Sequence, residues 1–181
     1  MNKWFEFYKN RINNFSYEEY FKKRYSPYLA YLNDNIRPNM KLGEFGCGTS
    51  LVTKLIWNKH CKFTVTDNNL QMLELTSTNL KNFKVKKCLI DIQKPIKDKF
   101  DLIYSHGVLE HFDPNNIDII ISNQLKICSH LVHYVPTIKY EKPSFGDERL
   151  WSHKYWLNRF KPTQSIHFNN DYDLILIWRR K

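Results

Sequence analysis

Residues 40–48, Met-Lys-Leu-Gly-Glu-Phe-Gly-Cys-Gly, decide the fold class of this chain. A short apolar segment ends here in a Gly-x-Gly turn, Gly46 to Gly48, and apolar residues then recur at helical spacing over residues 51–56. The pattern predicts a strand, a tight turn and a helix in that order. This unit is typical of the start of an alternating α/β fold.

The same alternation continues to the end of the chain. Further strands are predicted at residues 63–66, 85–90, 100–104, 131–135, 165–168 and 174–178, and helices near residues 70–80, 114–128 and 151–160. The last two strands are joined by Asn169-Asn170-Asp171, a hairpin turn signal. We therefore expect a doubly wound, mostly parallel seven-stranded sheet with an antiparallel C-terminal hairpin and helices on both faces.

The length of 181 residues fits one domain with a continuous apolar core. We expect a single domain over residues 1–181, with the α/β core at 39–181. Residues 1–38 precede the first strand and are rich in Tyr, Phe and Lys. They are predicted to form a helical cap over the site.

No apolar run approaches the roughly 18 to 20 residues of a membrane helix, and the first residues lack the apolar region of a secretory signal. The four cysteines, Cys47, Cys61, Cys88 and Cys128, form no CxxC pair and have no histidine at zinc-ligand spacing. They are interpreted as reduced thiols. The expected location is the cytoplasm, with no membrane partner and no metal.

Lys and Arg exceed Asp and Glu, 28 to 18, which gives a formal net charge of +10. A basic surface favours anionic partners such as nucleic acid. The lysines are scattered, however, and 21 Lys against 7 Arg, 18 Asn and a single alanine, Ala30, are typical of A- and T-rich coding. Coding bias is the preferred explanation, and nucleic acid stays open as an alternative partner.

The residues with special chemistry follow the ends of successive strands. Gly46 and Gly48 follow the first strand, Asp67 ends the second and Asp91 ends the third, with Ser105-His106-Gly107 after the fourth. In an open parallel sheet, ligands bind outside the carboxyl ends of the strands, and a carboxylate about twenty residues after a glycine turn accepts ribose hydroxyls. A nucleoside ligand is therefore expected.

At this point the sequence resembles the class I S-adenosylmethionine-dependent methyltransferases, whose fold is Rossmann-like. The resemblance rests on four motifs in family order across residues 41–135, namely Glu44-Phe45-Gly46-Cys47-Gly48-Thr49, Asp67, Asp91-Ile92 and the run 100–112, FDLIYSHGVLEHF. Residues 145–151, with Trp156, add a stretch found in some small members. One departure is Ser50, where many members have a third glycine.

The resemblance implies a role for each matching residue around S-adenosylmethionine. Glu44 would orient the ammonium of the methionine moiety, and the turn Gly46-Cys47-Gly48 would pass beneath that moiety. Asp67, with Asn68 beside it, would hold the ribose hydroxyls.

The adenine and the methyl end of the cofactor would meet later motifs of the same resemblance. Asp91 would accept from the adenine amine, with Ile92 on one face of the ring and Leu70 on the other. The backbone at Ser105 and His106 would face the methionine end. In the N-terminal segment, Arg24 is a candidate partner for the cofactor carboxylate, with a solvated arginine as the alternative.

Two histidines are candidates for a catalytic base. His106 and His111 follow the fourth strand, close to the expected position of the methyl group, and either is able to take a proton from a hydroxyl or amine. We rank His106 first, because a Glu-His pair such as Glu110-His111 commonly supports the loop in this family. Transfer by proximity alone, with no base, is the alternative for both.

Two other functional classes share part of the pattern. A nicotinamide-dependent dehydrogenase also has Gly-x-Gly and a later acidic residue, but it needs a third glycine, here Ser50, and a substrate domain. A non-catalytic S-adenosylmethionine-binding module would need degenerate motifs, and these are intact. An S-adenosylmethionine-dependent methyltransferase is the preferred function.

The methyl acceptor is poorly defined by the sequence. Enzymes that act on exocyclic base amines usually carry an Asn/Asp/Ser-Pro-Pro-aromatic turn, and residues 105–108 read Ser-His-Gly-Val instead. A small-molecule acceptor is the first expectation, because the 181 residues leave no separate recognition domain. RNA and protein acceptors stay open. The atom methylated and the oligomeric state are left undefined.

Overall fold

The structure, a computed structural model, describes residues 3–12 and 14–180. Its fold divides between Ile92 and Gln93 into two compact units. No helix in the described ranges is long and apolar enough to cross a membrane.

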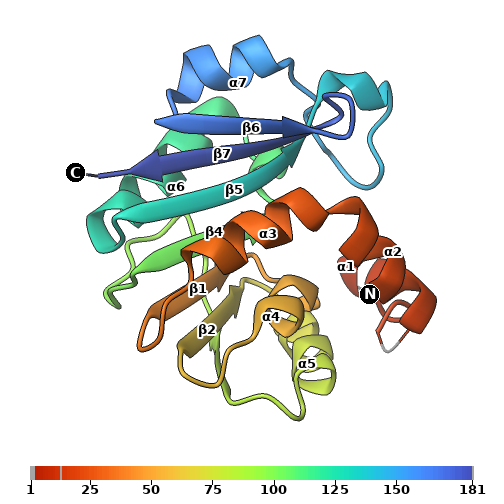
Figure 1. Ribbon diagram of the computed structural model, residues 1–181. Coiled ribbons are helices and arrows are strands. Elements are labelled where there is room, and N and C mark those ends of the chain that lie inside the picture. The colour runs from red at the N-terminus through yellow and green to blue at the C-terminus, as the bar shows by residue number, and fades with distance from the viewer. Residues whose placement is uncertain (1–2, 13, 181) are drawn as a thin grey trace. The chain divides into compact units, whose positions relative to one another are not determined.

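The first unit alternates helices and strands after an N-terminal run of three helices (Figure 1). Its elements are α1 (Lys3–Tyr8), α2 (Phe15–Arg24), α3 (Ser26–Asn35), β1 (Lys41–Phe45), α4 (Leu51–Ile56), β2 (Lys62–Asp67), α5 (Leu70–Asn79) and β3 (Val85–Leu89). The three strands are parallel in the order β3-β2-β1. Their register pairs Glu44 with Val65, and Asp67 with Leu89, so the strands end at one edge.

The N-terminal helices pack on the helices of the same unit. Helix α1 contacts α5 and helix α3 contacts α4, while an ion pair of 2.7 Å joins Glu18 of α2 to Lys54 of α4. Tyr28 and Leu32 of α3 are fully buried. Phe21 of α2 is buried as well, so α2 and α3 contribute side chains to the core of the first unit, whereas α1 has no buried residue.

The second unit holds the remaining four strands. Its elements are β4 (Leu102–His106), the 3₁₀ turn η1 (Leu109–His111), α6 (Pro114–Ile127), β5 (His130–Pro136), the 3₁₀ turn η2 (Ile138–Tyr140), α7 (His153–Phe160), β6 (Gln164–Phe168) and β7 (Asp173–Arg179). Strand β5 lies parallel to β4 and antiparallel to β7, which pairs antiparallel with β6. Six of the seven residues of β7 are buried, as expected of a strand inside a sheet.

The strand pattern confirms the predicted fold class, with seven strands, mostly parallel, and an antiparallel C-terminal hairpin. The hairpin turn is also at the predicted residues, where Asn169, Asn170 and Asp171 all have positive φ. Asn and Asp tolerate this left-handed region better than other residues do, which explains the signal.

Element ends differ from the sequence prediction by more than one residue in two elements. Strand β4 begins at Leu102 and includes His106, whereas the pattern predicted a strand over 100–104 with His106 in the turn. Helix α7 begins at His153 and not at Trp151, because the Ser152 side chain accepts a hydrogen bond from the Tyr155 amide and caps the helix. The 3₁₀ turns η1 and η2 were not predicted.

Candidate functional site

The Gly-x-Gly turn follows β1 and has a left-handed backbone at three positions. The φ angles of Gly46, Gly48 and Ser50 are +69°, +54° and +54°. Backbone hydrogen bonds fix the turn, since the Cys47 amide donates to the Thr66 carbonyl at 2.8 Å and the Ser50 amide donates to the Cys47 carbonyl at 2.6 Å. The turn is therefore tied to β2 in a conformation that glycine adopts at least cost.

Ser50 takes the place of the third glycine of many family members and has the conformation that favours glycine. Its side chain is fully buried, and its hydroxyl lies 3.5 Å from the Thr76 hydroxyl. A left-handed non-glycine residue costs about 1 to 2 kcal/mol. The departure seen in the sequence therefore leaves the turn geometry in place, with a hydroxyl contact as partial compensation.

Helix α5 holds the glycine turn through two side chains. The Thr76 hydroxyl donates to the Gly48 carbonyl at 2.7 Å, and the Asn79 amide donates to the Thr49 carbonyl at 2.7 Å. Both residues are buried. Sequence reasoning missed this support, and the only signal was that polar residues recur at positions 76 and 79 of an otherwise apolar helix face.

Glu44 is a buried carboxyl group directly before the turn. It is only 3% exposed, and one of its oxygens accepts a hydrogen bond of 2.6 Å from the Thr53 hydroxyl. Burial raises the pKa of Glu44 to about 8, although the hydrogen bonds from Thr53 and Ser50 oppose the shift. Burial and the Glu44 charge also raise the pKa of Tyr28 in α3. A cation bound beside this carboxyl group would favour its ionised form and so offset the effect of burial.

Asp67 joins the glycine turn to the end of β2. One carboxylate oxygen accepts from the Gly48 amide at 3.0 Å and the other accepts from the Asn69 amide at 3.0 Å. Burial raises the pKa of Asp67, and these backbone bonds oppose the rise. Each carboxylate oxygen has a second lone pair for a further donor.

The other candidate residues of the first unit lie around these two carboxyl groups or at its helix ends. Asn68 and Leu70 follow Asp67, and the Leu70 side chain is 61% exposed. The Ile90 amide donates to the Asp67 carbonyl at 2.9 Å, which brings the end of β3, with Asp91 and the buried Ile92, beside the end of β2.

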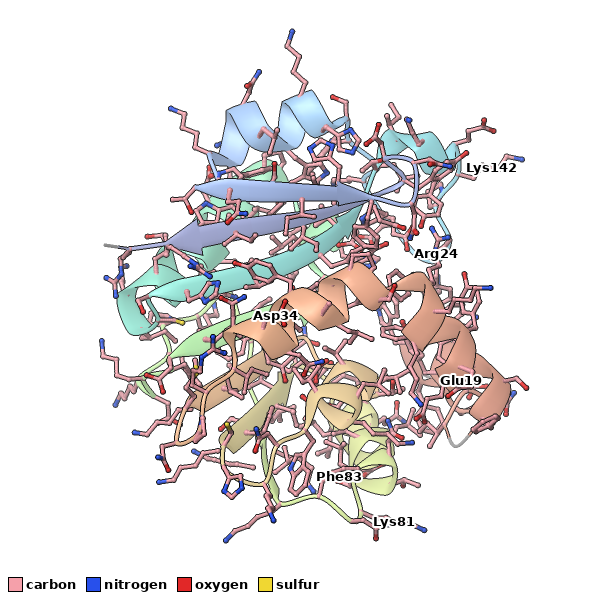
Figure 2. The ribbon with its side chains drawn as sticks, in the orientation of Figure 1. Glu19, Arg24, Asp34, Lys81, Phe83 and Lys142 are labelled. Atoms are coloured by element: carbon pink, nitrogen blue, oxygen red, sulfur yellow. The ribbon has the colours of Figure 1, made fainter. Side chains whose placement is uncertain are left out.

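Arg24 is the last residue of α2 (Figure 2), and its guanidinium lies 5.8 Å from the centre of the Tyr25 ring. Elsewhere in the first unit, the ring of Phe83, which is also labelled in Figure 2, packs on the ring of Trp57, with centroids 5.3 Å apart. Arg24 is half-buried, in keeping with either of the two roles considered for it.

Ser105, His106 and His111 belong to the second unit. The Ser105 hydroxyl lies 2.7 Å from Nδ1 of His133 in the neighbouring strand β5, and both side chains are buried. Burial lowers the pKa of His133 to about 3. The Ser105 hydroxyl is therefore engaged by His133 inside the sheet.

His106 stacks on Tyr134 of β5, with ring centroids 4.2 Å apart and an interplanar angle of 14°. Burial lowers the pKa of His106 to about 3. The Tyr134 hydroxyl donates to Asp173 at 2.7 Å, and the Tyr140 hydroxyl donates to the same carboxylate oxygen at 2.6 Å. His106 is therefore a neutral ring held in an aromatic stack.

His111 at the end of η1 pairs with a carboxylate. Its Nδ1 lies 3.2 Å from Asp147, and the His111 side chain is 14% exposed. Although burial acts to raise it, the hydrogen bond from His111 lowers the pKa of Asp147. The preceding Glu110 is buried, and burial raises the pKa of its carboxyl well above the usual range. A Cβ on Gly107 would lie 3.3 Å from that carboxyl, so the glycine makes room for it.

Comparison with known proteins gives one family match and many similar structures. Residues 43–126 match the model of a family described as a methyltransferase domain. No curated protein matches the sequence. The PH0226 protein from Pyrococcus horikoshii OT3 is similar in structure, with a TM-score of 0.79 and 14% identity over 97% of this chain and 99% of that chain.

Two other similar structures contain the demethylated cofactor. The N-methyltransferase NodS from Bradyrhizobium japonicum WM9, in complex with S-adenosylhomocysteine, has a TM-score of 0.72 and 15% identity over 99% of each chain. The magnesium protoporphyrin IX methyltransferase ChlM from Synechocystis PCC 6803, also with this molecule bound, has a TM-score of 0.71 and 12% identity over 88% of this chain and 83% of that chain.

A glycine turn held by a strand-end carboxylate in an α/β fold is the arrangement with which many proteins bind nucleoside cofactors. The match of residues 43–126 to a methyltransferase domain agrees with the resemblance found in the sequence, and the similar structures share the fold. Residues 43–126 are therefore a methyltransferase domain, which acts as a transferase with S-adenosylmethionine as its methyl donor.

Proposed function

We propose that this enzyme transfers a methyl group to a hydroxyl or amine of a small molecule, with His111 as the base. The observation that carries the proposal is the contact of 3.2 Å between His111 Nδ1 and the Asp147 carboxylate. A carboxylate on one ring nitrogen fixes the tautomer and orients the other nitrogen to take a proton. Asp147 is then a positioning residue.

The same geometry argues against His106, which the sequence ranked first. A base whose pKa is about 3 is too weak to take a proton from a hydroxyl or an ammonium near neutral pH. Its stacking on Tyr134 suits a neutral ring that shapes the site. We therefore propose that His106 positions the acceptor and leaves proton transfer to His111.

The first unit offers the groups that the cofactor requires. A buried carboxyl with a pKa of about 8 gains an opposite charge when an ammonium binds, so Glu44 suits the methionine end. Asp67 retains lone pairs for the ribose hydroxyls while it holds the turn. The bound cofactor supplies a methyl group already activated on a sulfonium.

The remaining contacts of the cofactor are proposed by position. The turn Gly46-Cys47-Gly48, which is left-handed at both glycines, would pass beneath the methionine moiety. Asp91 would accept from the adenine amine, with Ile92 and the exposed Leu70 on opposite ring faces. Arg24 would pair with the carboxylate, and Ser105 would contribute its backbone.

A small-molecule acceptor is supported by one of the similar structures. ChlM acts on magnesium protoporphyrin IX, which is a small molecule. RNA and protein acceptors are the alternatives, with the net charge of +10 in favour of RNA.

All four cysteines are free thiols, which supports action in the reducing cytoplasm. We also propose that residues 1–181 act as one domain with residues 1–38 as its cap.

Calorimetry tests the cofactor part of the proposal. S-adenosylhomocysteine is expected to bind in the micromolar range, about −7 to −9 kcal/mol, and NAD at least about a hundredfold more weakly. Equal or tighter binding of NAD would contradict the assignment.

A labelled-methyl screen tests the acceptor. Cell extract is separated into small-molecule, RNA and protein fractions, and label is expected only in the first. Label in RNA, together with submicromolar RNA affinity that persists at physiological salt, would favour the RNA alternative, because weak charge-driven binding disappears there. No label in any fraction, with tight cofactor binding, would favour a non-catalytic module.

A further inference from the structure

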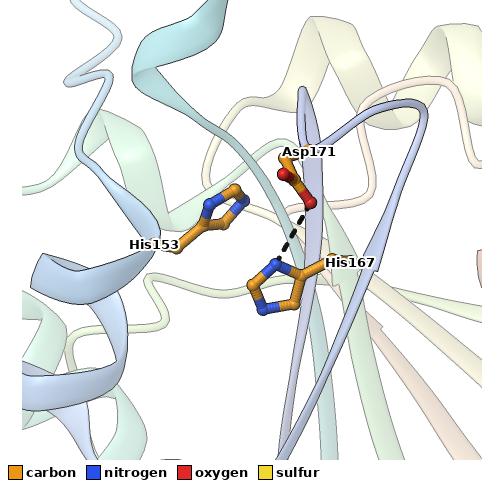
Figure 3. A group of neighbouring side chains, drawn as sticks. All are labelled: His153, His167 and Asp171. Carbon is orange, nitrogen blue, oxygen red and sulfur yellow. Dashed lines mark ion pairs between the residues drawn. The ribbon is translucent and has the colours of Figure 1, made fainter.

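Three side chains of the second unit, two histidines and an aspartate, lie close to one another. His153 begins α7, His167 lies in β6, and Asp171 lies in the turn between β6 and β7 (Figure 3). One ligand atom from each lies within 4.8 Å of the others. Segments separated in sequence thus present two imidazoles and a carboxylate to one point.

We propose that His153, His167 and Asp171 bind a divalent transition-metal ion of the zinc class. Imidazole and carboxylate are ligands that zinc accepts, and three protein ligands leave a fourth position for water. The site would be additional to the cofactor site and does not depend on the proposed acceptor.

The distances fit tetrahedral coordination if the His153 side chain moves slightly. Ligand atoms about 2.0 to 2.1 Å from a tetrahedral zinc ion lie about 3.3 Å apart. His167 Nδ1 and Asp171 Oδ1 are already 3.4 Å apart. The third atom comes from His153, whose ring lies 4.2 Å from that of His167 and is inclined by 32°. A side-chain rotation at the helix start brings it into range.

His153 has one ring nitrogen to offer. Its Nε2 is buried and has no hydrogen-bond partner in the described part of the chain. The ring also interacts with the backbone of Asp171. Metal-bound histidines usually donate their other ring N–H to a carbonyl or carboxylate, which fixes the ring orientation. A buried nitrogen without a partner is the kind of atom that an ion would satisfy.

The turn holds the carboxylate where the site needs it. The Asp171 carbonyl accepts from the Thr137 hydroxyl at 2.7 Å, and Lys139 Nζ donates to the Asn170 carbonyl at 2.9 Å. Lys139 Nζ also lies 3.4 Å from the second carboxylate oxygen of Asp171. The lysine partly neutralises the Asp171 carboxylate through Oδ2, but Oδ1 still faces His167. Bound zinc would link α7, β6 and the hairpin turn.

Zinc titration of the full chain, purified without a polyhistidine tag and treated with a chelator, tests the proposal. We expect one zinc ion per chain by calorimetry and a higher unfolding temperature, because an ion that binds only the folded state stabilises it. With cobalt in place of zinc, tetrahedral binding is expected to give visible absorption bands. No binding at millimolar zinc would overturn the proposal.

Three variants locate the site. His153→Asn, His167→Asn and Asp171→Asn are each expected to weaken zinc binding at least about tenfold, since even residues that only support ligands contribute this much. Asn tolerates the positive φ of residue 171, so Asp171→Asn is expected to fold even if a histidine variant does not. The exposed His60, changed to Asn, is the control for adventitious surface binding.

A second group of potential metal ligands in the described residues defines the outcome that would contradict the proposal. Glu110, His111 and Glu148 also lie within reach of one another. Zinc binding that survives the three variants but is lost in His111→Asn would assign the ion to that group and overturn the proposal. Binding that survives all of these changes would overturn it as well.

Discussion

The glycine turn of the first unit and the β4–η1 segment of the second are built in different ways. In the turn, the groups that are held are backbone groups, since the Gly48 amide donates to Asp67 and the Gly48 carbonyl accepts from Thr76. The β4–η1 segment is fixed by side chains, with His106 on Tyr134 and His111 on Asp147. Backbone contacts suit a ligand that a whole family shares, whereas side-chain contacts are free to change with the acceptor. The predictions below test this difference.

The largest effect is expected at His111. His111→Asn removes the proposed base, so turnover should fall by about a hundredfold or more while affinity for S-adenosylhomocysteine is unchanged. The matched control is His106→Phe, which keeps an aromatic ring on Tyr134 and should change turnover less than about tenfold. Turnover is measured against pH once an acceptor is known.

The pH profile separates the two histidines further. Because the pKa of His106 is about 3, its titration lies below the range of an assay near neutral pH. The acidic limb of the profile should therefore persist in His106→Phe and disappear in His111→Asn. Asp147→Asn should lower turnover less than loss of His111 does. The reverse order of the two histidine variants would restore His106 as the base.

The next effect is expected at Asp67. Asp67→Ala removes the proposed acceptor for the ribose, so cofactor affinity should fall by about 1.5 to 3 kcal/mol. The structure adds a second consequence, because the carboxylate also holds the Gly48 amide and its loss should lower the free energy of unfolding by about 1 kcal/mol or more.

The exposed Asp34 of α3 (Figure 2), changed to Ala, controls for the loss of a surface charge. Calorimetry and chemical unfolding measure both effects of Asp67→Ala. Reduced affinity with unchanged stability would show that the backbone contacts of Asp67 are energetically unimportant.

These two sets of residues also show what the sequence was able to predict. The succession of strands and helices along the chain and the residues at the strand ends followed from the sequence pattern, because glycine and carboxylate positions are set by local backbone needs. The His111–Asp147 pair joins residues 36 positions apart across a long loop, and the stack of His106 on Tyr134 depends on strand register. Periodicity carries no signal for such contacts, and burial of His106 made its pKa unlike that of a free histidine.

A smaller effect is expected from the charge of Glu44. Its folded-state pKa of about 8 lies above the usual value of 4.5, so the folded chain holds a proton that the unfolded chain releases between these pH values. Stability from this group is present below pH 4.5 and is lost as pH rises to 8. Glu44→Gln should therefore be more stable than the unchanged protein at pH 9, by at least about 1 kcal/mol.

The measurement is chemical unfolding without cofactor at several pH values. Thr53→Val removes a donor to the Glu44 carboxylate, which should raise its pKa further and extend the decline in stability to higher pH. Saturating S-adenosylmethionine should flatten it, because an ammonium beside Glu44 favours the ionised form. A Glu44→Gln variant with the same pH dependence as the unchanged protein would show that Glu44 is ionised in the folded state throughout.

The smallest effect is expected at Ser50, where the glycine turn departs from the family pattern. Ser50→Gly removes the cost of a left-handed φ of +54° but also removes the hydroxyl contact with Thr76 and adds freedom to the unfolded chain. These terms are similar in size, so stability should change by less than about 1 kcal/mol. Ser50→Ala keeps the strained backbone and loses the hydroxyl, so it should destabilise by about 1 kcal/mol. Chemical unfolding of both variants, with cofactor affinity as a second readout, compares the cost of the backbone strain with the contribution of the hydroxyl contact. If the alanine variant proves as stable as the glycine variant, backbone strain at Ser50 is negligible and the turn is held by its hydrogen bonds alone.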